Sequence, residues 1–266
     1  MLDSYNRKIN YLRISVTDRC NLRCVYCMPE NGVPLLKHDD ILSFHEIVTV
    51  TKIAVQKGID KIRITGGEPL VRKGIVDLIR MIGKIEGISD FSMTTNAILL
   101  DQFAEDLKKA GLHRVNISLD TIDPEKFSQI TRGGDIQKVF AGIEAAKNAG
   151  LEPIKINCVI KKDHHEPDAL TVAKFCDENN LHVRFIQEMN LEKGDFSVVH
   201  GGTGGDCGNC NRIRLTANGM IKPCLFSDIQ YNVRELGAEK AIDLAVGNKP
   251  QSGHVNLTGK FYNIGG

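Results

Sequence analysis

Residues 17–27 read Thr-Asp-Arg-Cys-Asn-Leu-Arg-Cys-Val-Tyr-Cys and hold three cysteines, Cys20, Cys24 and Cys27, at C-x3-C-x2-C spacing. The apolar run directly before them, residues 11–16, is typical of a first strand. Thiolates are the soft ligands that iron–sulfur clusters prefer, and a cubane cluster usually takes four of them. Because this loop offers three, the pattern indicates a 4Fe-4S cluster with one iron open to a small molecule. The alternative is a zinc site, which normally needs a fourth ligand.

A second set of three cysteines, Cys207, Cys210 and Cys224, lies near the end of the chain. Residues 213–216 and 220–222 flank the sequence Ala-Asn-Gly at 217–219, which predicts a hairpin that returns Cys224 toward the other two. Both a second cluster and a zinc knuckle with a distant histidine fit this set. The remaining two cysteines, Cys158 and Cys176, lie in apolar patterns and are predicted to be packed thiols.

The composition sets broad limits on what the chain does. Its 266 residues suffice for one barrel-sized domain with an appendage, and a formal net charge of +1 gives no general attraction to nucleic acid or to a membrane. No run approaches the length of a membrane span and the N-terminus lacks a signal-peptide pattern, so we expect a cytoplasmic protein. The clustering of the cysteines favours metal binding in a reducing compartment over disulfides.

Strand and helix signals alternate along the first 190 residues. The predicted strands cover residues 11–16, 61–65, 90–94, 114–118, 154–160 and 182–187, and the predicted helices cover residues 43–57, 74–85, 101–110, 136–149 and 167–179. Six such units predict an α/β fold, a partial (β/α)6 TIM-like barrel whose functional groups gather at the carboxyl ends of its strands. We predict this barrel for residues 1–190, a glycine-rich connector for residues 191–206, and a small C-terminal iron–sulfur segment with a polar tail for residues 207–266.

The first cysteine motif, with Tyr26 before its last cysteine, resembles that of the radical S-adenosylmethionine enzymes. In that superfamily the open iron chelates the amino and carboxylate groups of S-adenosylmethionine, which is split to give a 5′-deoxyadenosyl radical. Thr-Asp-Arg-Cys-Asn at 17–21, Met-Pro at 28–29 and Cys-Asn-Arg-Ile-Arg at 210–214 narrow the resemblance to the GTP 3′,8-cyclases of molybdenum cofactor biosynthesis. The resemblance implies a lyase that converts GTP to (8S)-3′,8-cyclo-7,8-dihydroguanosine 5′-triphosphate.

A Gly-Gly-Glu-Pro sequence at 66–69 follows the second predicted strand. Two glycines let a ligand approach the backbone closely, and Glu68 can accept a hydrogen bond from an ammonium group. On its own this sequence could mark only a turn. The resemblance implies that S-adenosylmethionine is bound by residues in the first part of the chain and after the sixth strand, namely Tyr26, Gly67, Glu68, Ser118 and Met189.

Basic residues recur on the predicted strands. A single strand arginine is often solvated at an edge, but several around the barrel mouth suit a triphosphate, which arginine binds through paired hydrogen bonds. The resemblance places GTP contacts on Arg13, Arg63, Thr94, Lys155, Arg184, Arg212, Ile213 and Arg214. It also implies that all six clustered cysteines are metal ligands, Cys20, Cys24, Cys27, Cys207, Cys210 and Cys224, and that the second cluster meets the guanine.

Two departures from the family pattern bear on the pocket. Residues 191–206 replace a longer segment that helps close the side of the barrel, so we expect an exposed pocket or one completed by a partner chain. Ala97 stands where the family has glycine, and alanine tolerates a positive φ poorly. A paralogue acting on another nucleotide or a peptide, and a non-catalytic cluster-binding relative, therefore stay open. The resemblance further implies an electron donor and a role for the terminal Gly265-Gly266 in catalysis, and it is compatible with a homodimer.

Overall fold

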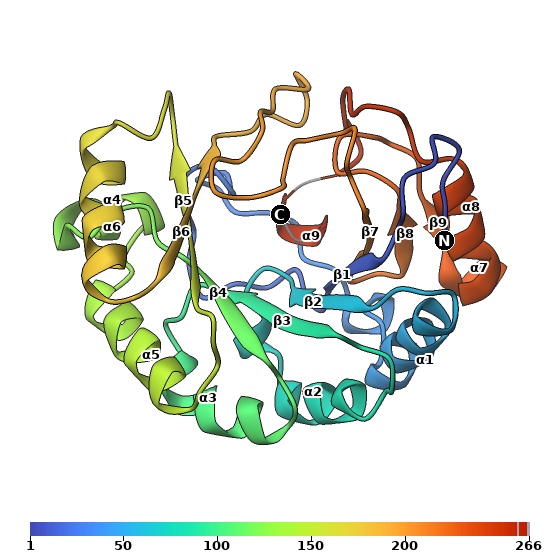
Figure 1. Ribbon diagram of the computed structural model, residues 1–266, viewed down its shortest axis with the longest axis horizontal. Helices are drawn as coiled ribbons and strands as arrows, with labels where there is room; N and C mark the ends of the chain where they lie inside the picture. Colours follow the sequence, from blue (N-terminus) through green and yellow to red (C-terminus); the bar gives the residue numbers. More distant parts are fainter. Residues whose placement is uncertain (260, 265–266) are drawn as a thin grey trace.

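A single curved sheet forms the centre of the computed structural model, which describes residues 1–259 and 261–264. Its strands run in the order β6-β5-β4-β3-β2-β1-β7-β8-β9, and the sheet bends into an unclosed barrel with helices on its outside (Figure 1). The strands are β1 Tyr11–Ser15, β2 Lys61–Thr65, β3 Asp90–Thr95, β4 Arg114–Ser118, β5 Lys155–Ile160, β6 His182–Gln187, β7 Arg212–Leu215, β8 Met220–Lys222 and β9 Tyr231–Asn232.

Strands β1 to β6 pair in parallel and in chain order, which confirms the predicted partial barrel. The helices between them are α1 Phe44–Gln56, α2 Ile75–Gly83, α3 Leu100–Lys109, α4 Pro124–Thr131, α5 Ile136–Asn148 and α6 Pro167–Glu178, with short 3-10 helices η1 His38–Asp40 and η2 Pro69–Val71. No helix in the described ranges is long and apolar enough to cross a membrane. Ser43 caps α1 as predicted, in a reciprocal capping box with Glu46.

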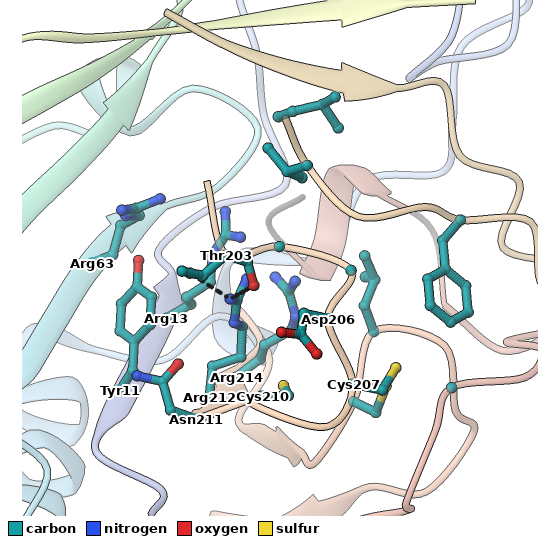
Figure 2. A pocket seen from close by; sticks show the side chains of 18 of the residues that line it. Tyr11, Arg13, Arg63, Thr203, Asp206, Cys207, Cys210, Asn211, Arg212 and Arg214 are labelled. Atoms are coloured by element: carbon teal, nitrogen blue, oxygen red, sulfur yellow. Dashed lines mark hydrogen bonds between the residues drawn. The ribbon is translucent and has the colours of Figure 1, made fainter. Parts of the chain in front are cut away.

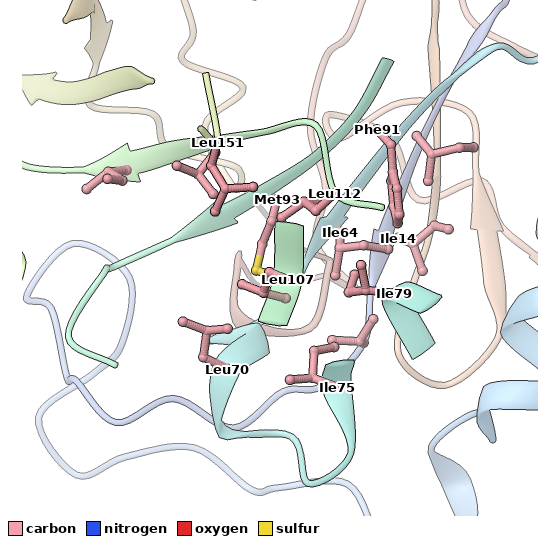
Figure 3. Close-up of a cluster of buried hydrophobic side chains, with 14 of the residues drawn as sticks. Ile14, Ile64, Leu70, Ile75, Ile79, Phe91, Met93, Leu107, Leu112 and Leu151 are labelled. Atoms are coloured by element: carbon pink, nitrogen blue, oxygen red, sulfur yellow. The ribbon is translucent and has the colours of Figure 1, made fainter. Parts of the chain in front are cut away.

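The hydrophobic core lies between the outer face of the sheet and these helices. Alternate residues of the strands, such as Ile14, Ile64 and Met93, point toward α2 and α3 and are fully buried (Figure 3). The intervening residues therefore point into the barrel, because successive side chains on a strand face opposite ways. This alternation decides which strand residues can reach a ligand.

Four of the α-helices, α4 and three near the end of the chain, were not predicted from the sequence. Helix α4 begins after Asp123, whose carboxylate accepts hydrogen bonds from the backbone of Glu125 and Lys126, and it is only eight residues long. The stretch after Cys224, for which no element was predicted, contains α7 Val233–Leu236, α8 Ala238–Gly247 and α9 Phe261–Ile264. Helix α8 buries its apolar face, which includes Ile242.

The C-terminal cysteine segment continues the barrel sheet. Strand β7 lies parallel to β1 on the side opposite β2, with Arg214 level with Arg13. Strand β8 then turns back along β7 through a tight turn at Gly219, which confirms the predicted hairpin. β1 is therefore flanked by one strand that follows it closely in sequence and by one from near the end of the chain.

A buried ion pair ties the N-terminal residues to the C-terminal part. The Arg7 Nε donates to Asp3 Oδ2 at 2.7 Å. Its other nitrogens donate to the carbonyl oxygens of Cys207, Pro250 and Gln251 at 2.7, 2.7 and 2.8 Å. Burial raises the pKa of Asp3, but the hydrogen bonds from Arg7 outweigh burial and leave that pKa below its usual 3.8.

We expect Arg7→Met to lower the free energy of unfolding by about 3–5 kcal/mol, because Asp3 would remain as an uncompensated buried charge. Urea denaturation of the apoprotein measures this. The exposed Lys8 offers the matched control, and Lys8→Met should change the free energy by no more than about 0.5 kcal/mol. Because the folded pKa of Asp3 is depressed, its contribution is present above about pH 4 and disappears at lower pH. Equal effects of the two substitutions would contradict this prediction.

Candidate active site

The two cysteine sets lie at opposite ends of the barrel, one at the carboxyl ends of the parallel strands and the other at their amino ends. Cys20, Cys24 and Cys27 follow the carboxyl end of β1, whereas Cys207 and Cys210 directly precede β7, which is parallel to β1. Cys224 follows β8, which is antiparallel to β7, and so returns to the same end of the barrel as Cys207 and Cys210. The inside of the barrel separates one set from the other.

The end of α4 holds the first cysteine loop. The backbone nitrogens of Arg23 and Val25 donate to the carbonyl oxygens of Thr131 and Ile130 at 3.1 and 3.0 Å. Arg132, which has a φ of +54°, donates from Nη1 to the carbonyl oxygens of Arg23 and Met28 at 2.9 Å each. The loop therefore depends on a helix that the sequence analysis missed.

The glycines at 66–67 serve the backbone of the cysteine loop itself. A Cβ atom on Gly67 would lie 2.3 Å from the carbonyl oxygen of Arg19, and one on Gly66 would lie 2.8 Å from that of Thr17. Hydrogen bonds follow from this close approach, since Gly67 N donates to Thr17 O at 2.7 Å and Glu68 N donates to Arg19 O at 2.8 Å. The sequence suggested that these glycines let a ligand approach the backbone. In the structure they let the backbone of the cysteine loop approach closely.

Glu68 is buried and links two loops. Its carboxylate accepts hydrogen bonds from Leu70 N at 3.1 Å, Thr95 Oγ1 at 2.8 Å and Asn96 N at 2.7 Å. Burial raises the pKa of Glu68 to about 7 despite these donors. Asn96 in turn donates from Nδ2 toward Cys20 Sγ at 3.7 Å, so Glu68 positions a residue that contacts the first cysteine set.

Tyr26 is anchored through its hydroxyl group. It donates to Asp120 Oδ2 at 2.8 Å, and Asp120 Oδ1 accepts from Val159 N at 2.8 Å. Burial raises the pKa of Asp120 to about 6, and both hydrogen bonds oppose that rise. The Tyr26 ring therefore bridges the cysteine loop and the segment after β4.

The second set has a cation built into it. The Lys249 ammonium donates to the carbonyl oxygens of Arg212 and Pro223 at 2.9 and 2.6 Å. Burial raises the pKa of the Cys210 thiol, but the charge of Lys249 and the backbone hydrogen bond and charge of Arg212 outweigh burial and leave that pKa lowered. In the first set burial dominates, and it raises the pKa of Cys24 to about 12 and that of Cys27 to about 11.

The donor sets fit iron–sulfur clusters better than zinc. All eight cysteines are free thiols, and Cys158 and Cys176 are fully buried, as predicted for packed thiols. Within residues 1–259 and 261–264, no group of three or more cysteine, histidine or acidic side chains converges closely enough to hold one metal ion. A tetrahedral zinc site requires such convergence, whereas a cubane spreads its thiolates over separate iron corners.

A cavity of about 330 Å³ lies inside the barrel and reaches the second cysteine set (Figure 2). Nine basic side chains and only two acidic ones line it, so it is suited to a polyanion. The basic residues are Arg13, Lys61, Arg63, Arg114, Lys155, Arg184, Arg212, Arg214 and Lys249. Asp90 is already paired with Arg114, through contacts of 2.9 and 2.6 Å.

Three of these arginines form a row. Arg63, Arg13 and Arg214 stand level with one another on the adjacent strands β2, β1 and β7, and their exposed fractions are 8%, 8% and 5%. Burial and then Arg214 hold the pKa of Arg13 well below its usual range, and burial and then Arg212 lower the pKa of Arg214 to about 10. Like charges in register oppose folding unless an anion compensates them.

Several buried polar atoms on the inward face have no hydrogen-bond partner in the described part of the chain. They are Tyr11 Oη on β1, Thr65 Oγ1 on β2, Thr94 Oγ1 on β3 and Arg212 Nε on β7. Buried polar groups are normally satisfied, so unpaired atoms on one inward surface indicate a bound polar ligand. The Tyr11 ring additionally packs under the guanidinium groups of Arg63 and Arg212, at 5.3 and 5.9 Å from the ring centre.

The cavity brings together most of the predicted substrate residues, namely Arg13, Arg63, Lys155, Arg184, Arg212 and Arg214, and also Met189. Thr94 does not line it, and Ile213 points into the core, fully buried. Ser118 ends β4 and also lies outside the cavity lining. The predicted position at the carboxyl-end mouth needs correction, because Lys155 and Arg212 begin their strands and Arg13 and Arg63 lie mid-strand.

Sequence reasoning missed three basic lining residues. Lys61 and Arg114 begin β2 and β4, and Lys61 shares the inward face with Arg63, so strand alternation could have found it. Lys249 lies just after α8, in a stretch without any motif, and no sequence signal marked it.

The shortened segment covers the side of the cavity that was expected to be open. It crosses from β6 toward β7 (Figure 1) and contributes to the lining through Phe196, Ser197, Val199, Thr203 and the residues up to Asp206. His200 pairs with Phe185 at the free edge of β6. The short segment thus forms part of the cavity wall, and the expectation of an exposed pocket or of one completed by a partner chain stays a prediction. Ala97 keeps a positive φ of +63°, so the turn after β3 retains the conformation that glycine favours.

The profile of the Radical SAM superfamily matches residues 14–176. Proteins named GTP 3′,8-cyclase from Peptoclostridium acidaminophilum and Thermodesulfovibrio yellowstonii are each 43% identical to this chain. The first alignment spans 277 positions and covers 88% of this chain and 85% of the relative, and the second spans 282 positions and covers 89% and 88%. Both alignments exceed the 266 residues of the chain, so the relatives contain residues without a counterpart here.

Among solved structures, Streptococcus suis SuiB bound to S-adenosylmethionine superposes with a TM-score of 0.65. The superposition covers 92% of this chain and 65% of SuiB, at 15% identity. At that identity the likeness shows the fold alone, and it agrees with the partial barrel described above.

We expect Gly67→Ala to abolish iron binding at the first cysteine set, because the added methyl group would collide with the backbone of Arg19. Iron per chain after anaerobic reconstitution should fall by about half, since one of two sites loses its supporting geometry. Gly247→Ala is the control, because its added methyl group meets no atom within 4 Å. Full iron loading of Gly67→Ala would show that the loop adapts to the larger side chain.

Tyr26→Phe should raise the pKa of Asp120 above its present value of about 6, because the hydroxyl hydrogen bond that favours the carboxylate is lost. Carbon-13 NMR titration of the Asp120 carboxyl group in the apoprotein measures this. Since the folded pKa already exceeds the usual 3.8, the contribution of Asp120 to stability decreases as pH rises from about 4 to 6. This window should extend to higher pH in Tyr26→Phe but not in Tyr5→Phe, whose ring is exposed.

Proposed function

The chain belongs to the Radical SAM superfamily and, within it, to the family of GTP 3′,8-cyclases, and we propose on this premise that it joins ribose carbon 3′ to guanine carbon 8 of GTP. The product is (8S)-3′,8-cyclo-7,8-dihydroguanosine 5′-triphosphate, a precursor in molybdenum cofactor biosynthesis. The cofactors are those of the family, S-adenosylmethionine and two 4Fe-4S clusters.

The observation that carries this proposal is the basic cavity that reaches the second cysteine set. A triphosphate brings about four negative charges, and arginine binds such groups through paired hydrogen bonds. Arg63, Arg13 and Arg214 present their guanidinium groups side by side, so they supply donors without a large rearrangement. We assign GTP contacts to this row and to Lys155, Arg184 and Arg212, which line the cavity, and, outside its lining, to Thr94 and to the backbone of Ile213.

The cluster and cofactor assignments correspond to the two ends of the barrel. Cys20, Cys24 and Cys27 would hold one cluster and Cys207, Cys210 and Cys224 the other. S-Adenosylmethionine would be bound by Tyr26, Gly67, Glu68, Ser118 and Met189. When bound, the clusters and S-adenosylmethionine supply the radical chemistry, and the protein supplies binding, orientation and protection from water.

Met189 supports a connection between the cofactor end and the substrate cavity. It follows β6, at the carboxyl edge where the first cysteine set lies, and it also lines the basic cavity. Asn157 lines the same cavity and stands level with Ser118 in the sheet. These two positions support a site in which the assigned cofactor contacts adjoin the part of the cavity nearest the carboxyl ends of the strands, where the ribose of GTP would have to lie.

An electron donor is required as a partner, because no described residue supplies the electron for each turnover. A homodimer remains a prediction. Action on a different nucleotide or on a peptide is not favoured, since the relatives that cover most of this chain are cyclases and the cavity suits a triphosphate.

The direct test is an anaerobic assay of the reconstituted protein with dithionite, S-adenosylmethionine and GTP. Mass spectrometry should detect 5′-deoxyadenosine and cyclised GTP together. Formation of 5′-deoxyadenosine that does not respond to GTP would retain a radical enzyme but exclude GTP as its substrate. Absence of both products from iron-loaded protein would indicate a non-catalytic relative.

Arg13→Met should weaken GTP binding by at least about 30-fold, which corresponds to about 2 kcal/mol for a buried charged contact. Arg13 is suited to this test because it occupies the centre of the arginine row. The KM for GTP in the same assay measures the effect. Arg80→Met, on the exposed face of α2, serves as the control and should leave the KM unchanged. An unchanged KM in Arg13→Met would remove the row from the triphosphate site.

A further inference from the structure

Lys249 is a buried lysine beside the second cysteine set. Only 3% of its surface is exposed, and it lines the basic cavity together with Cys207, Cys210 and Cys224. It follows directly after α8, whose last turn holds it, since Lys249 N donates to Val246 O at 3.3 Å. A lysine is rarely buried to this degree unless its charge is used.

Its ammonium connects the two parts of the cysteine set. One hydrogen bond goes to Arg212 O, at the start of β7 and two residues after Cys210. Another goes to Pro223 O, the carbonyl group directly before Cys224. Cys210 lines the same cavity as this ammonium group, whose positive charge lowers the pKa of the Cys210 thiol. One side chain thereby fixes the relation between Cys210 and Cys224, which lie on either side of the β7–β8 hairpin.

The location of the charge adds a second effect. Three thiolates give a cluster a net negative charge, and adding an electron makes that charge more negative. An ammonium group fixed between the carbonyl groups of Arg212 and Pro223, next to Cys210 and Cys224, favours the reduced form, because opposite charges attract strongly where water is excluded. The first cysteine set has no corresponding lysine or arginine hydrogen-bonded to a thiol in the described residues: Cys20 Sγ is contacted by Leu22 N and the Asn96 amide.

We propose that Lys249 is a positioning residue of the second cluster, which holds Cys210 and Cys224 in place and raises the reduction potential of the cluster bound there. This inference rests on the proposed function, because that function assigns a cluster to Cys207, Cys210 and Cys224. The inference goes beyond the proposed function, because it makes one residue, Lys249, responsible for both the geometry and the reduction potential of the second site.

The test uses the full chain with the first set removed by Cys20→Ala, Cys24→Ala and Cys27→Ala, so that only the second cluster contributes to the spectra. Lys249→Met and Lys249→Arg are compared in this background after anaerobic reconstitution. Lys155→Met is the matched control, because Lys155 lines the same cavity from β5. Iron per chain and the EPR signal during reductive titration are the measurements.

At the midpoint potential of the parent, we expect the ratio of reduced to oxidised cluster to fall at least about threefold in Lys249→Met. The ratio should return close to the parent value in Lys249→Arg, which keeps the charge, and should not change in Lys155→Met. Selective loss of iron from Lys249→Met, with an unchanged far-UV circular dichroism spectrum, would also support the positioning role.

Three results would overturn the proposal. The first is an unchanged iron content and an unchanged titration in Lys249→Met. The second is loss of iron together with loss of the apoprotein fold, which would assign Lys249 to general packing. The third is a parent that binds no cluster at all, which would refute the second cluster itself and so separates failure of the proposed function from failure of the role of Lys249.

Discussion

Three guanidinium groups at one level of the sheet, on β2, β1 and β7, are the interaction on which the rest of the site depends. Arg63, Arg13 and Arg214 are nearly fully buried and repel one another. The apoprotein tolerates this because the hydrophobic face of the same strands is well packed against α2 and α3. A bound polyanion is attracted by all three guanidinium groups and offsets their mutual repulsion. The repulsion that lowers the stability of the empty protein therefore favours binding of the ligand.

The two cysteine sets have different surroundings at the two ends of the barrel. One set follows the carboxyl end of β1 and is supported by α4, the 66–69 turn and Asp120. The other precedes β7 and is supported by Arg7 and Lys249. The supports differ in kind, because backbone hydrogen bonds and close glycine contacts hold the first loop, whereas buried cations hold the second. The two sites therefore offer different electrostatic surroundings to the same type of cluster.

Much of this arrangement could be predicted from the sequence. Alternation of apolar strands and amphipathic helices predicted the barrel, and the spacing of the cysteines predicted the two candidate cluster sites. What failed depended on contacts between distant segments. The eight-residue α4 is too short to show a clear periodicity, and the pairing of β7 with β1 leaves no local signal. Lys249 likewise acquires its role only where the end of α8 meets the β7–β8 hairpin.

The position of β7 has a consequence for how the chain is made. Asn10 and Asn211, next to the paired ends of β1 and β7, are 201 positions apart and joined by a side-chain hydrogen bond of 2.8 Å. On a ribosome, β1 is made 201 positions before β7, and the edge of β1 that pairs with β7 remains without this partner until then. Contacts this distant in sequence slow folding and expose an edge that invites misassembly. The complete arginine row and the placement of the second cysteine set beside it therefore both depend on the pairing of β7 with β1.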